Sequence, residues 1–352
     1  MEAGKYKYEI LQKYIEDSIA AGTLASGDRV PSENELARMF ETSHITARRA
    51  LSELVNKGKI YRVKGKGSFV SERKKQGDDL VFRCLMALDA QHDFSLLQMI
   101  QGAKQYFDAK GVGFQLDLVQ ADTRHHLDYL FALAESKSAG VMLWPIEPDQ
   151  YIDAFYRLQE KGIPFVLLDR RTYSLQTNYS GSDNTAGAYM QVQHLAGLGH
   201  KRMAFIGQDP SLNTEKERAS GFQLAVSDLL PGEQCYLFYA SANVESEILP
   251  LIRSGEVTAL VCVNDRTAVD CLGKLAQSGI SVPEDVSIIG FDDWEPARYT
   301  QPALTTIRQD FPEIGCQAAK LLWNSARHKG RGVKTVLQSV SLVVRESTAQ
   351  PR

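Results

Sequence analysis

Residues 32–70 read SENELARMFETSHITARRALSELVNKGKIYRVKGKGSFV, and this stretch decides the fold of the first fifth of the chain. Ser32 with a glutamate three positions later has the pattern of a capping box, which predicts that a short helix begins here. The apolar spacing over 42–58 predicts a second helix, and the alternation around a glycine-rich turn in 60–70 predicts a hairpin. An amphipathic helix over 7–21 precedes both. Three helices followed by a hairpin form a winged helix-turn-helix, an α+β fold.

The charge of the chain is divided unevenly between this region and the rest. Residues 1–75 contain 15 Lys and Arg against 10 Asp and Glu, a net charge of +5, whereas residues 76–352 contain 25 against 33, a net charge of −8. A basic head on an acidic body is typical of a protein whose head meets a polyanion. In a helix-turn-helix, the recognition helix enters the major groove, and a wing can reach phosphates or the minor groove.

Side chains that can bind bases and phosphates occupy both of these elements. Arginine bonds a guanine edge bidentately, and serine or threonine hydroxyls bond bases or phosphates. Glycines beside the wing lysines allow a close approach to the DNA backbone. The candidates for DNA contact are Ser43, His44, Thr46, Arg48 and Arg49 in the helix, and Lys64, Gly65, Lys66 and Gly67 in the wing.

The stretch Tyr6–Val70 resembles the DNA-binding head of the GntR family of bacterial regulators over its whole length. The resemblance implies DNA contacts by Lys5, Tyr6, Ser32, Ser43, Thr46, Arg48, Lys64, Gly65 and Gly67. Asn34 and His44 stand where the family often has arginine. We therefore expect a base preference that differs from that of the usual family operators.

From residue 80 onward, short apolar runs alternate with helical segments. The polar, charged residues 72–79 are expected to be a linker between a head over 1–71 and a body over 80–352. The alternation predicts parallel sheets with helices on both faces, and the length of the body favours two α/β lobes. Strands are expected over 80–88, 114–119, 139–144, 164–168, 202–206, 258–263 and 286–291, and helices near 95–110, 124–136, 148–161, 184–198, 214–229, 265–278 and 310–328.

Several motifs of the body resemble the LacI-type effector domain, which is similar in turn to periplasmic sugar-binding proteins. They are GSDNTAGAYMQVQHLAGLGHKRMAFIG (181–207), ERASGFQLAV (217–226), VTALVCVNDRTAVDCLGKLAQSGISVPEDVSIIGFDD (257–293) and PALTTIRQDFPEIGCQAAKLL (302–322). The resemblance implies a ligand cleft between two lobes that are joined by three crossovers. The crossovers are expected near 181–183, 307–309 and 333–338, which gives a first lobe of about 80–181 and 308–333 and a second lobe of about 182–307 and 334–352.

The resemblance also implies a sugar ligand, and the residues suit that chemistry. Adjacent hydroxyls both donate and accept hydrogen bonds, so carboxylates, amides and arginines bind them in pairs. An aromatic ring covers the apolar face of a pyranose. The expected ligand-binding residues are Arg218, Asn264, Asp292 and Asp169, with Phe94 and Ser95 after the first strand, and with Trp144, Trp294 and Tyr179 as candidate stacking rings.

Simpler interpretations remain open for some of these residues. Arg218 at a helix start also fits a surface charge, and Trp294 fits packing inside a lobe. Asn264 and Asp265 are suited to capping a helix, which we favour for Asp265. Asp293 is expected to cap a turn.

An enzyme is not expected. The sequence has no G-x-S-x-G, no H-E-x-x-H and no dinucleotide-binding G-x-G-x-x-G after the first strand, and neither a metal nor a cofactor is expected. A transport-type binding protein is the other class to weigh, but the charged N-terminus does not resemble a signal peptide and the head is basic. With no long apolar run and five scattered cysteines, the chain is expected to be cytoplasmic.

A GntR-like head on a LacI-like body resembles the arabinose repressors of Firmicutes. This pairing implies a repressor of sugar-utilisation genes that acts as a homodimer on double-stranded operator DNA. L-arabinose is the first candidate for an effector that releases the operator. A sugar or nucleoside that promotes DNA binding, and a sugar-binding protein without regulation, are the alternatives.

Overall fold

The chain forms two compact units, Met1–Asp78 and Asp79–Arg352, which are called the head and the body below. The expected linker, 72–79, lies outside the described residues. The computed structural model describes residues 7–57, 59–63, 65–71, 81–87, 94–136, 138–239, 244–328 and 332–352.

The head is a winged helix-turn-helix, as predicted. Its elements are α1 (Lys7–Ala20), α2 (Glu33–Met39), α3 (His44–Asn56) and an antiparallel hairpin of β1 (Ile60–Val63) and β2 (Gly67–Val70). Leu11 and Ile15 of α1 are fully buried against Leu36 of α2 and Leu51 and Leu54 of α3. This apolar contact fixes the three helices so that the opposite face of α3 is left to solvent.

The first lobe of the body is built on a sheet of six parallel strands, with the order β13-β7-β6-β5-β3-β4. The strands are β3 (Val81–Ala87), β4 (Gly113–Val119), β5 (Gly140–Leu143), β6 (Phe165–Leu168), β7 (Asn178–Ser182) and β13 (Thr335–Gln338). The central strands β5 and β6 are buried at every residue. Such continuous apolar strands are typical of a parallel sheet that is covered on both faces.

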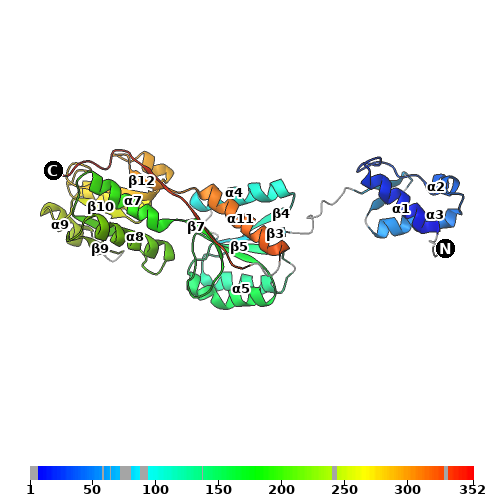
Figure 1. The fold of residues 1–352 in the computed structure, drawn as a ribbon, viewed down its shortest axis with the longest axis horizontal. Coiled ribbons are helices and arrows are strands. Elements are labelled where there is room, and N and C mark those ends of the chain that lie inside the picture. Colours follow the sequence, from blue (N-terminus) through cyan, green and yellow to red (C-terminus); the bar gives the residue numbers. More distant parts are fainter. Residues whose placement is uncertain are drawn as a thin grey trace. The chain divides into compact units, whose positions relative to one another are not determined.

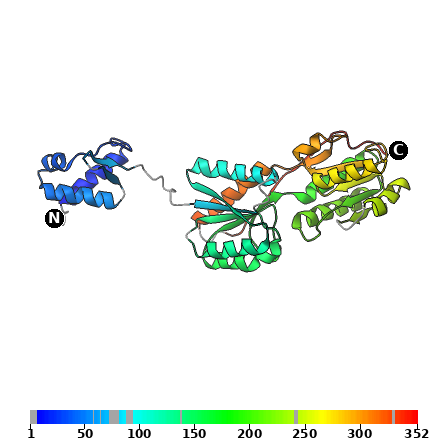
Figure 2. The same ribbon diagram turned by 180° about the vertical axis from the view of Figure 1, so that it is seen from behind.

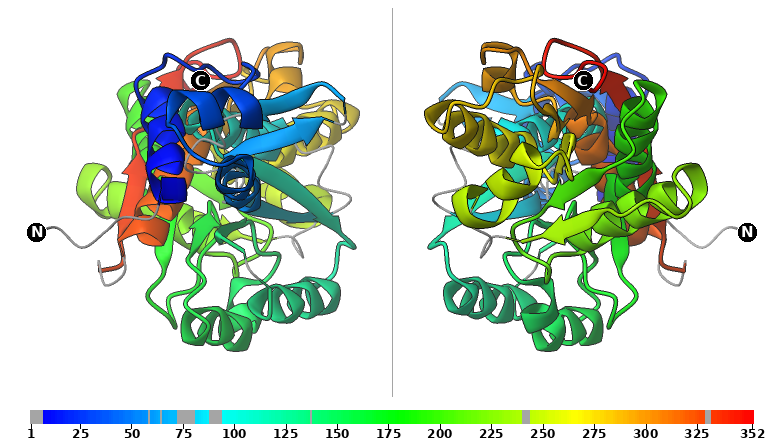
Figure 3. Two further views of the ribbon diagram at one scale, coloured as in Figure 1. Left: turned by 90° about the vertical axis from the view of Figure 1, so that its right-hand side faces the viewer. Right: turned by 90° about the vertical axis from the view of Figure 1, so that its left-hand side faces the viewer.

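Helices cover both faces of this sheet. On one face, α4 (Phe94–Lys110) packs against α11 (Phe311–Arg327), and both contribute to one apolar core (Figure 1). On the other face, α5 (Thr123–Ala134) lies beside α6 (Ile152–Glu160), which follows a 3-10 turn, η2 (Pro148–Tyr151) (Figure 3).

The second lobe repeats this layered plan. Its sheet has the order β14-β12-β11-β10-β8-β9, in which only β14 is antiparallel to its neighbour. On one face lie α7 (Asn184–Gly197) and α8 (Asn213–Leu229), which are labelled in Figure 1, and on the other face lies α10 (Asp265–Gln277), the yellow helix in front in Figure 2. The remaining elements are β8 (Met203–Ile206), β9 (Tyr236–Phe238), η3 (Val244–Ile248), α9 (Leu249–Arg253), β10 (Ala259–Cys262), β11 (Ser287–Asp292), η4 (Glu295–Arg298), β12 (Thr305–Arg308) and β14 (Ser341–Val343).

The chain passes between the lobes three times, and one expected crossover is wrong. The first passage lies between β7 and α7 and the second between β12 and α11, as expected. The third was expected at 333–338, but β13 pairs in parallel with β7, with Thr335 opposite Tyr179, and so belongs to the first lobe. The passage comes after it, between Gln338 and Ser341.

The described helices include none that is both long enough and apolar enough to cross a membrane.

Candidate functional site

A cavity of about 310 Å³ lies between the two lobes of the body. Eight of the nine residues expected to bind ligand line it, so the structure brings together side chains that are up to 200 positions apart in the sequence. They are Phe94, Ser95, Trp144 and Asp169 from the first lobe and Arg218, Asn264, Asp292 and Trp294 from the second.

Their placement follows from the direction of the strands. Trp144 follows β5, Asp169 follows β6, Asn264 follows β10 and Asp292 ends β11. Because the strands that carry them run parallel within each lobe, these residues gather at the carboxyl edge of each sheet. The two carboxyl edges face each other across the cavity.

Arg218 on α8 is the best-anchored cation of the cavity, with 6% of its surface exposed. Its Nε donates to Asn184 Oδ1 at 2.9 Å and its Nη1 donates to the carbonyl oxygen of Val263 at 2.7 Å. The guanidinium lies over the Phe291 ring at 3.8 Å, and Nη1 is 3.5 Å from Asp292 Oδ1. The surface-charge interpretation of Arg218 is therefore wrong.

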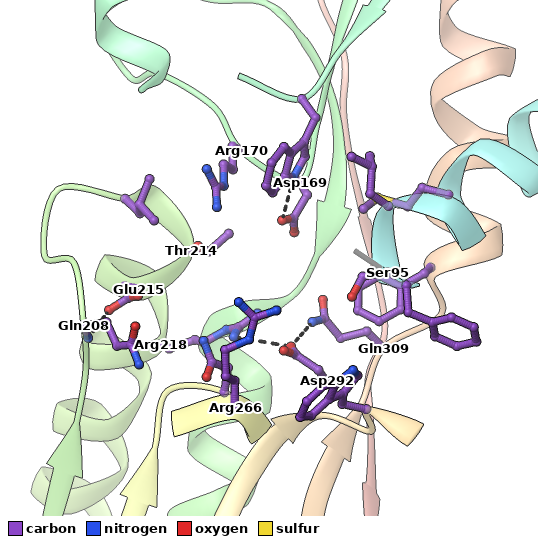
Figure 4. A pocket seen from close by; sticks show the side chains of 18 of the residues that line it. Ser95, Asp169, Arg170, Gln208, Thr214, Glu215, Arg218, Arg266, Asp292 and Gln309 are labelled. Carbon is purple, nitrogen blue, oxygen red and sulfur yellow. Dashed lines mark hydrogen bonds and ion pairs between the residues drawn. The ribbon is translucent and has the colours of Figure 1, made fainter. Parts of the chain in front are cut away.

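Asp292 sits between two side chains that reach it from different elements (Figure 4). Besides the ion pair with Arg218, its Oδ1 accepts a hydrogen bond from Gln309 Nε2 at 2.6 Å. Gln309 lies on the second passage between the lobes, is 7% exposed, and has no hydrogen-bond partner for its Oε1. An acceptor that lines the cavity in this way can be satisfied by a hydroxyl of a ligand.

On the first-lobe side, Asp169 and Trp144 lie together. Trp144 Nε1 donates to Asp169 Oδ2 at 3.5 Å, and the guanidinium of Arg170 covers the Trp144 ring at 3.8 Å. Asp169 has a backbone φ of +57°, a conformation that non-glycine residues seldom adopt. Tyr179, the other candidate stacking ring, does not line the cavity: it is buried beneath it and donates its hydroxyl to the Asp169 carbonyl oxygen at 2.8 Å.

The helix cap at α10 is Asn264, and Asp265 has a different task. Asn264 Oδ1 accepts the Thr267 N–H at 2.8 Å. Asp265 is fully buried and accepts the backbone N–H of Trp294 at 2.7 Å, so it fixes the loop that carries this ring into the cavity. Burial, and then the nearby Asp292 carboxylate, raise the pKa of Asp265 well above its usual value.

Asp293 is the centre of an ion cluster rather than a simple turn cap. Its carboxylate, 3% exposed, pairs with Arg298 at 3.1 Å, with Arg308 at 2.7 Å and with Arg345. Burial alone would raise the pKa of Asp293, but the hydrogen bonds from Arg345 and Arg308 outweigh it and keep this pKa below its usual value. Because Asp292 and Asp293 have φ of +125° and +56°, this cluster stabilises a backbone conformation that non-glycine residues otherwise avoid.

The sequence did not single out several lining residues. Some lie in loops after a strand, and others lie in the first turns of helices, where their apolar or polar character does not distinguish them from ordinary core or surface positions. These residues are Leu96, Met99, Arg170, Gln208, Asp209, Leu212, Thr214, Glu215, Arg266, Gln309 and Phe311.

The cavity as a whole offers paired polar groups between aromatic rings. Carboxylates, amides and guanidinium groups lie within one space, and Trp144, Trp294, Phe94 and Phe311 supply apolar surface. Vicinal hydroxyls on a flat apolar ring match such a lining, because each hydroxyl both donates and accepts.

In the head, the predicted DNA contacts of α3 lie at its solvent-facing N-terminus. Ser43 caps the helix by accepting the Thr46 N–H at 3.2 Å, and the two hydroxyls are 2.8 Å apart. His44, Ile45 and Arg48 point outward, and Ile45 is 79% exposed. Ile45 was missed because it falls outside the apolar stripe of the helix, yet an exposed aliphatic group here suits contact with a thymine methyl.

The two arginines of α3 form ion pairs with acidic side chains of the head. Arg48 Nε is 3.0 Å from Glu33 Oε2, while Arg49 Nε is 3.2 Å from Glu53 Oε1 and its guanidinium covers the Tyr8 ring at 4.1 Å. Exposed ion pairs contribute only about 0–1 kcal/mol, so exchanging Glu33 for a base or phosphate costs Arg48 little.

The remaining predicted contacts lie at helix and hairpin turns. Ser32 caps α2 in the expected capping box with Glu35. Gly65 and Gly67 have φ of +77° and +115°, so the wing turn requires glycine at both positions, and Lys66 between them is exposed. Lys5, Tyr6 and Lys64 lie outside the described residues.

Two protein-family models match the chain. Residues 7–70 match the GntR family of bacterial regulatory proteins, and residues 192–348 match the periplasmic binding protein-like domain. Together they cover the head and most of the second lobe.

Curated relatives and solved structures extend these matches. An arabinose metabolism transcriptional repressor of Halalkalibacterium halodurans is 27% identical over 98% of this chain and 97% of its own length, and one of Geobacillus stearothermophilus is 28% identical over 98% of each. The structure of a LacI family transcriptional regulator from Enterococcus faecium with bound ribose superposes with a TM-score of 0.65, at 25% identity, over 77% of this chain and 100% of its own. The chain thus joins a helix-turn-helix head of the GntR family to a periplasmic-binding-protein-like body of the LacI type.

Proposed function

We propose that this protein is a transcriptional repressor of sugar-utilisation genes that binds operator DNA through its head and a monosaccharide in its body. The first candidate for the monosaccharide is L-arabinose, and binding of the sugar releases the operator. The relatives that share both the head and the body carry the name of arabinose metabolism repressors, which favours this sugar over others.

The observation that carries the proposal is the convergence of Asp169, Arg218, Asn264 and Asp292 on one cavity. The carboxylates of Asp169 and Asp292 lie at strand ends on opposite lobes. A ligand that forms hydrogen bonds with both is therefore held only when the lobes are close. A ligand that prefers one lobe arrangement shifts the population toward it. Coupling between two sites by this route is typically about 1–3 kcal/mol, or roughly 5- to 150-fold in affinity.

The head supplies the second half of the proposal. Its α3 N-terminus, with His44 and Arg48 exposed, enters the major groove, while Lys66 and the wing glycines follow the phosphates. Two copies of the chain place two heads on the half-sites of a near-palindrome, because a twofold dimer matches twofold DNA. The sugar then weakens binding by changing the lobe arrangement that spaces the heads.

Two titrations with the full chain test the proposal. Calorimetry with L-arabinose, D-ribose and D-xylose measures sugar binding, and fluorescence anisotropy with duplexes from the upstream region of its own gene measures operator binding, with and without the preferred sugar. We expect L-arabinose to bind and to weaken the operator complex at least fivefold. Sugar binding without any effect on DNA affinity, or tighter DNA binding with sugar, contradicts the proposed release.

Salt dependence tests whether the head contacts the phosphates of the operator. Phosphate contacts release counterions, so operator affinity should fall steeply as salt rises from 50 to 200 mM. Arg48→Ala should weaken operator binding by about 1–3 kcal/mol if Arg48 reads a base, while the sugar affinity of the variant stays at that of the wild type. A flat salt response argues against phosphate contacts.

A further inference from the structure

Beside the cavity, a partly buried polar contact joins the two lobes. Arg171, in the loop after β6, donates from Nη2 to Oε1 of Glu217 on α8 at 2.7 Å, and the two side chains are 19% and 12% exposed. The backbone N–H of Arg171 donates to Asn213 Oδ1 at 2.8 Å. Asn213 and Glu217 are four residues apart and share one face of α8. The first lobe is therefore fastened to that face of the helix at two points.

The guanidinium of Arg171 has little freedom to leave this contact. It lies over the rings of Tyr179, at 4.5 Å, and Tyr173, at 4.9 Å, and Tyr173 also donates its hydroxyl to Glu217 Oε1. A planar guanidinium that both stacks and forms hydrogen bonds is not replaceable by lysine without loss. The contact is thus a built, oriented pair rather than a loose surface ion pair.

The Glu217 carboxylate is connected to Arg218 of the cavity through the side-chain amide of Asn184. Glu217 Oε2 accepts from Asn184 Nδ2 at 2.8 Å, and Asn184 Oδ1 accepts from Arg218 Nε at 2.9 Å. Asn184 is 1% exposed and begins α7, directly after the first passage between the lobes. Because an amide has one donating and one accepting end, the carboxylate dictates which end faces Arg218.

We propose that Arg171 and Glu217 form an interlobe latch, which sets the angle between the lobes in the ligand-free body and positions Arg218 for the effector. Neither residue lines the cavity, so both are positioning residues. The latch itself depends only on the contacts described above; its role toward a sugar rests on the proposed function.

The first test needs no ligand. Glu217→Gln keeps the shape of the side chain, but its NH₂ group must then face either Arg171 or Asn184, which both donate. Single-molecule energy transfer between dyes on non-natural amino acids at the exposed Tyr156 and Gln277, in the full chain, reports the angle between the lobes. We expect a broader distribution shifted to longer distances in Glu217→Gln and in Arg171→Met.

A matched control removes an ion pair that lies within one lobe. Arg157 pairs with Glu135 at 2.7 Å on the surface of the first lobe. Arg157→Met should leave the distance distribution as in the wild type. If the latch variants also give the wild-type distribution while circular dichroism shows them folded, the latch is overturned.

The second test is a double-mutant cycle on sugar affinity. We expect Arg171→Met and Glu217→Gln each to raise the Kd for L-arabinose about tenfold, and the double variant to be no weaker than the weaker single variant, because both changes break one unit. Unchanged affinity, or effects that add fully, overturn the positioning role. If the wild type binds none of the tested sugars, the proposed function fails instead, and the energy-transfer measurement still decides whether the latch exists.

Discussion

Replacing Asp292 by asparagine removes one negative charge from the cavity and leaves its volume unchanged. The asparagine oxygen can still accept from Gln309, which reaches Asp292 at 2.6 Å. Two things change. Arg218 loses the carboxylate that lies 3.5 Å from its Nη1, and a sugar hydroxyl meets a neutral acceptor instead of a carboxylate.

The size of the effect follows from these two losses. A hydrogen bond to a charged group is worth about 1.5–3 kcal/mol, against about 0.5–1.5 kcal/mol for a neutral one. If Asp292 accepts one or two sugar hydroxyls, the loss is about 1–3 kcal/mol, or roughly 5- to 150-fold in Kd. We therefore expect the Asp292→Asn variant to bind L-arabinose about 10- to 100-fold more weakly than the wild type.

The effect on folding should be smaller, because two contributions oppose each other. The Asp292 charge helps to raise the pKa of buried Asp265. A carboxyl group whose pKa is higher in the folded than in the unfolded protein makes the protein less stable as the pH rises toward the folded-state pKa. Removing the charge relieves this cost at neutral pH. Arg218, on the other side, loses its ion pair with Asp292, which costs stability. The free energy of unfolding without sugar should therefore change less than the free energy of binding.

Calorimetry with L-arabinose, anisotropy with operator DNA and urea unfolding together measure these quantities. Asp228→Asn is the matched control, since Asp228 is exposed on α8 ten residues beyond Arg218, about 15 Å along the helix. The control should match the wild type in every assay, and Asp292→Asn should retain operator affinity while needing more sugar for release. A folded Asp292→Asn variant whose sugar Kd lies within twofold of the wild type would refute the assignment of Asp292.

Three further predictions concern packing, pH and the head. Gly315→Ala should destabilise the body by about 1–3 kcal/mol, because its Cβ would lie 1.8 Å from a carbonyl oxygen of the facing α4. Gly273→Ala, whose Cβ would meet open space, should stabilise the body by about 0.5–1 kcal/mol. Urea unfolding measures both changes. Burial lowers the pKa of His200, so stability should fall as the pH drops below about 6.5, by at most about 1.4 kcal/mol per pH unit, and less in His200→Gln than in the exposed His328→Gln control. Arg48→Glu should abolish operator binding yet leave the thermal midpoint of the head nearly unchanged, since the arginine is 68% exposed; loss of both readouts would indicate misfolding.

Much of the fold was predictable because its signals are local. The capping box at Ser32, the glycines of the wing and the apolar strands of the body each follow from a short stretch of sequence. The short edge strand β13 was assigned to the wrong lobe for the opposite reason. Its residues TVLQ are half exposed and carry little pattern, and their place is decided by pairing with β7, more than 150 residues earlier.

The cavity was predictable only in part. Residues that end apolar strands, such as Asp292, can be recognised from their position in the sequence. Gln309 and Arg170 line the cavity only because loops that are distant in the sequence pack together. The roles of Asp265 and Asp293 were misread for the same physical reason. A carboxylate near a helix start or in a turn usually caps local N–H groups, and only the three-dimensional structure shows that Asp265 holds the Trp294 loop and that Asp293 gathers three arginines.

The polar networks around the cavity connect it directly with the segments that pass between the lobes. The loop that carries Asp292 into the cavity is tied through Asp293 to Arg308, at the second passage between the lobes, and to Arg345, shortly after the third. Gln309 bonds Asp292 directly from the second passage. A ligand that forms a hydrogen bond with Asp292 would therefore contact a residue that is bonded directly to the segments between the lobes. No long chain of intermediate contacts is then needed to connect binding with a change in lobe angle.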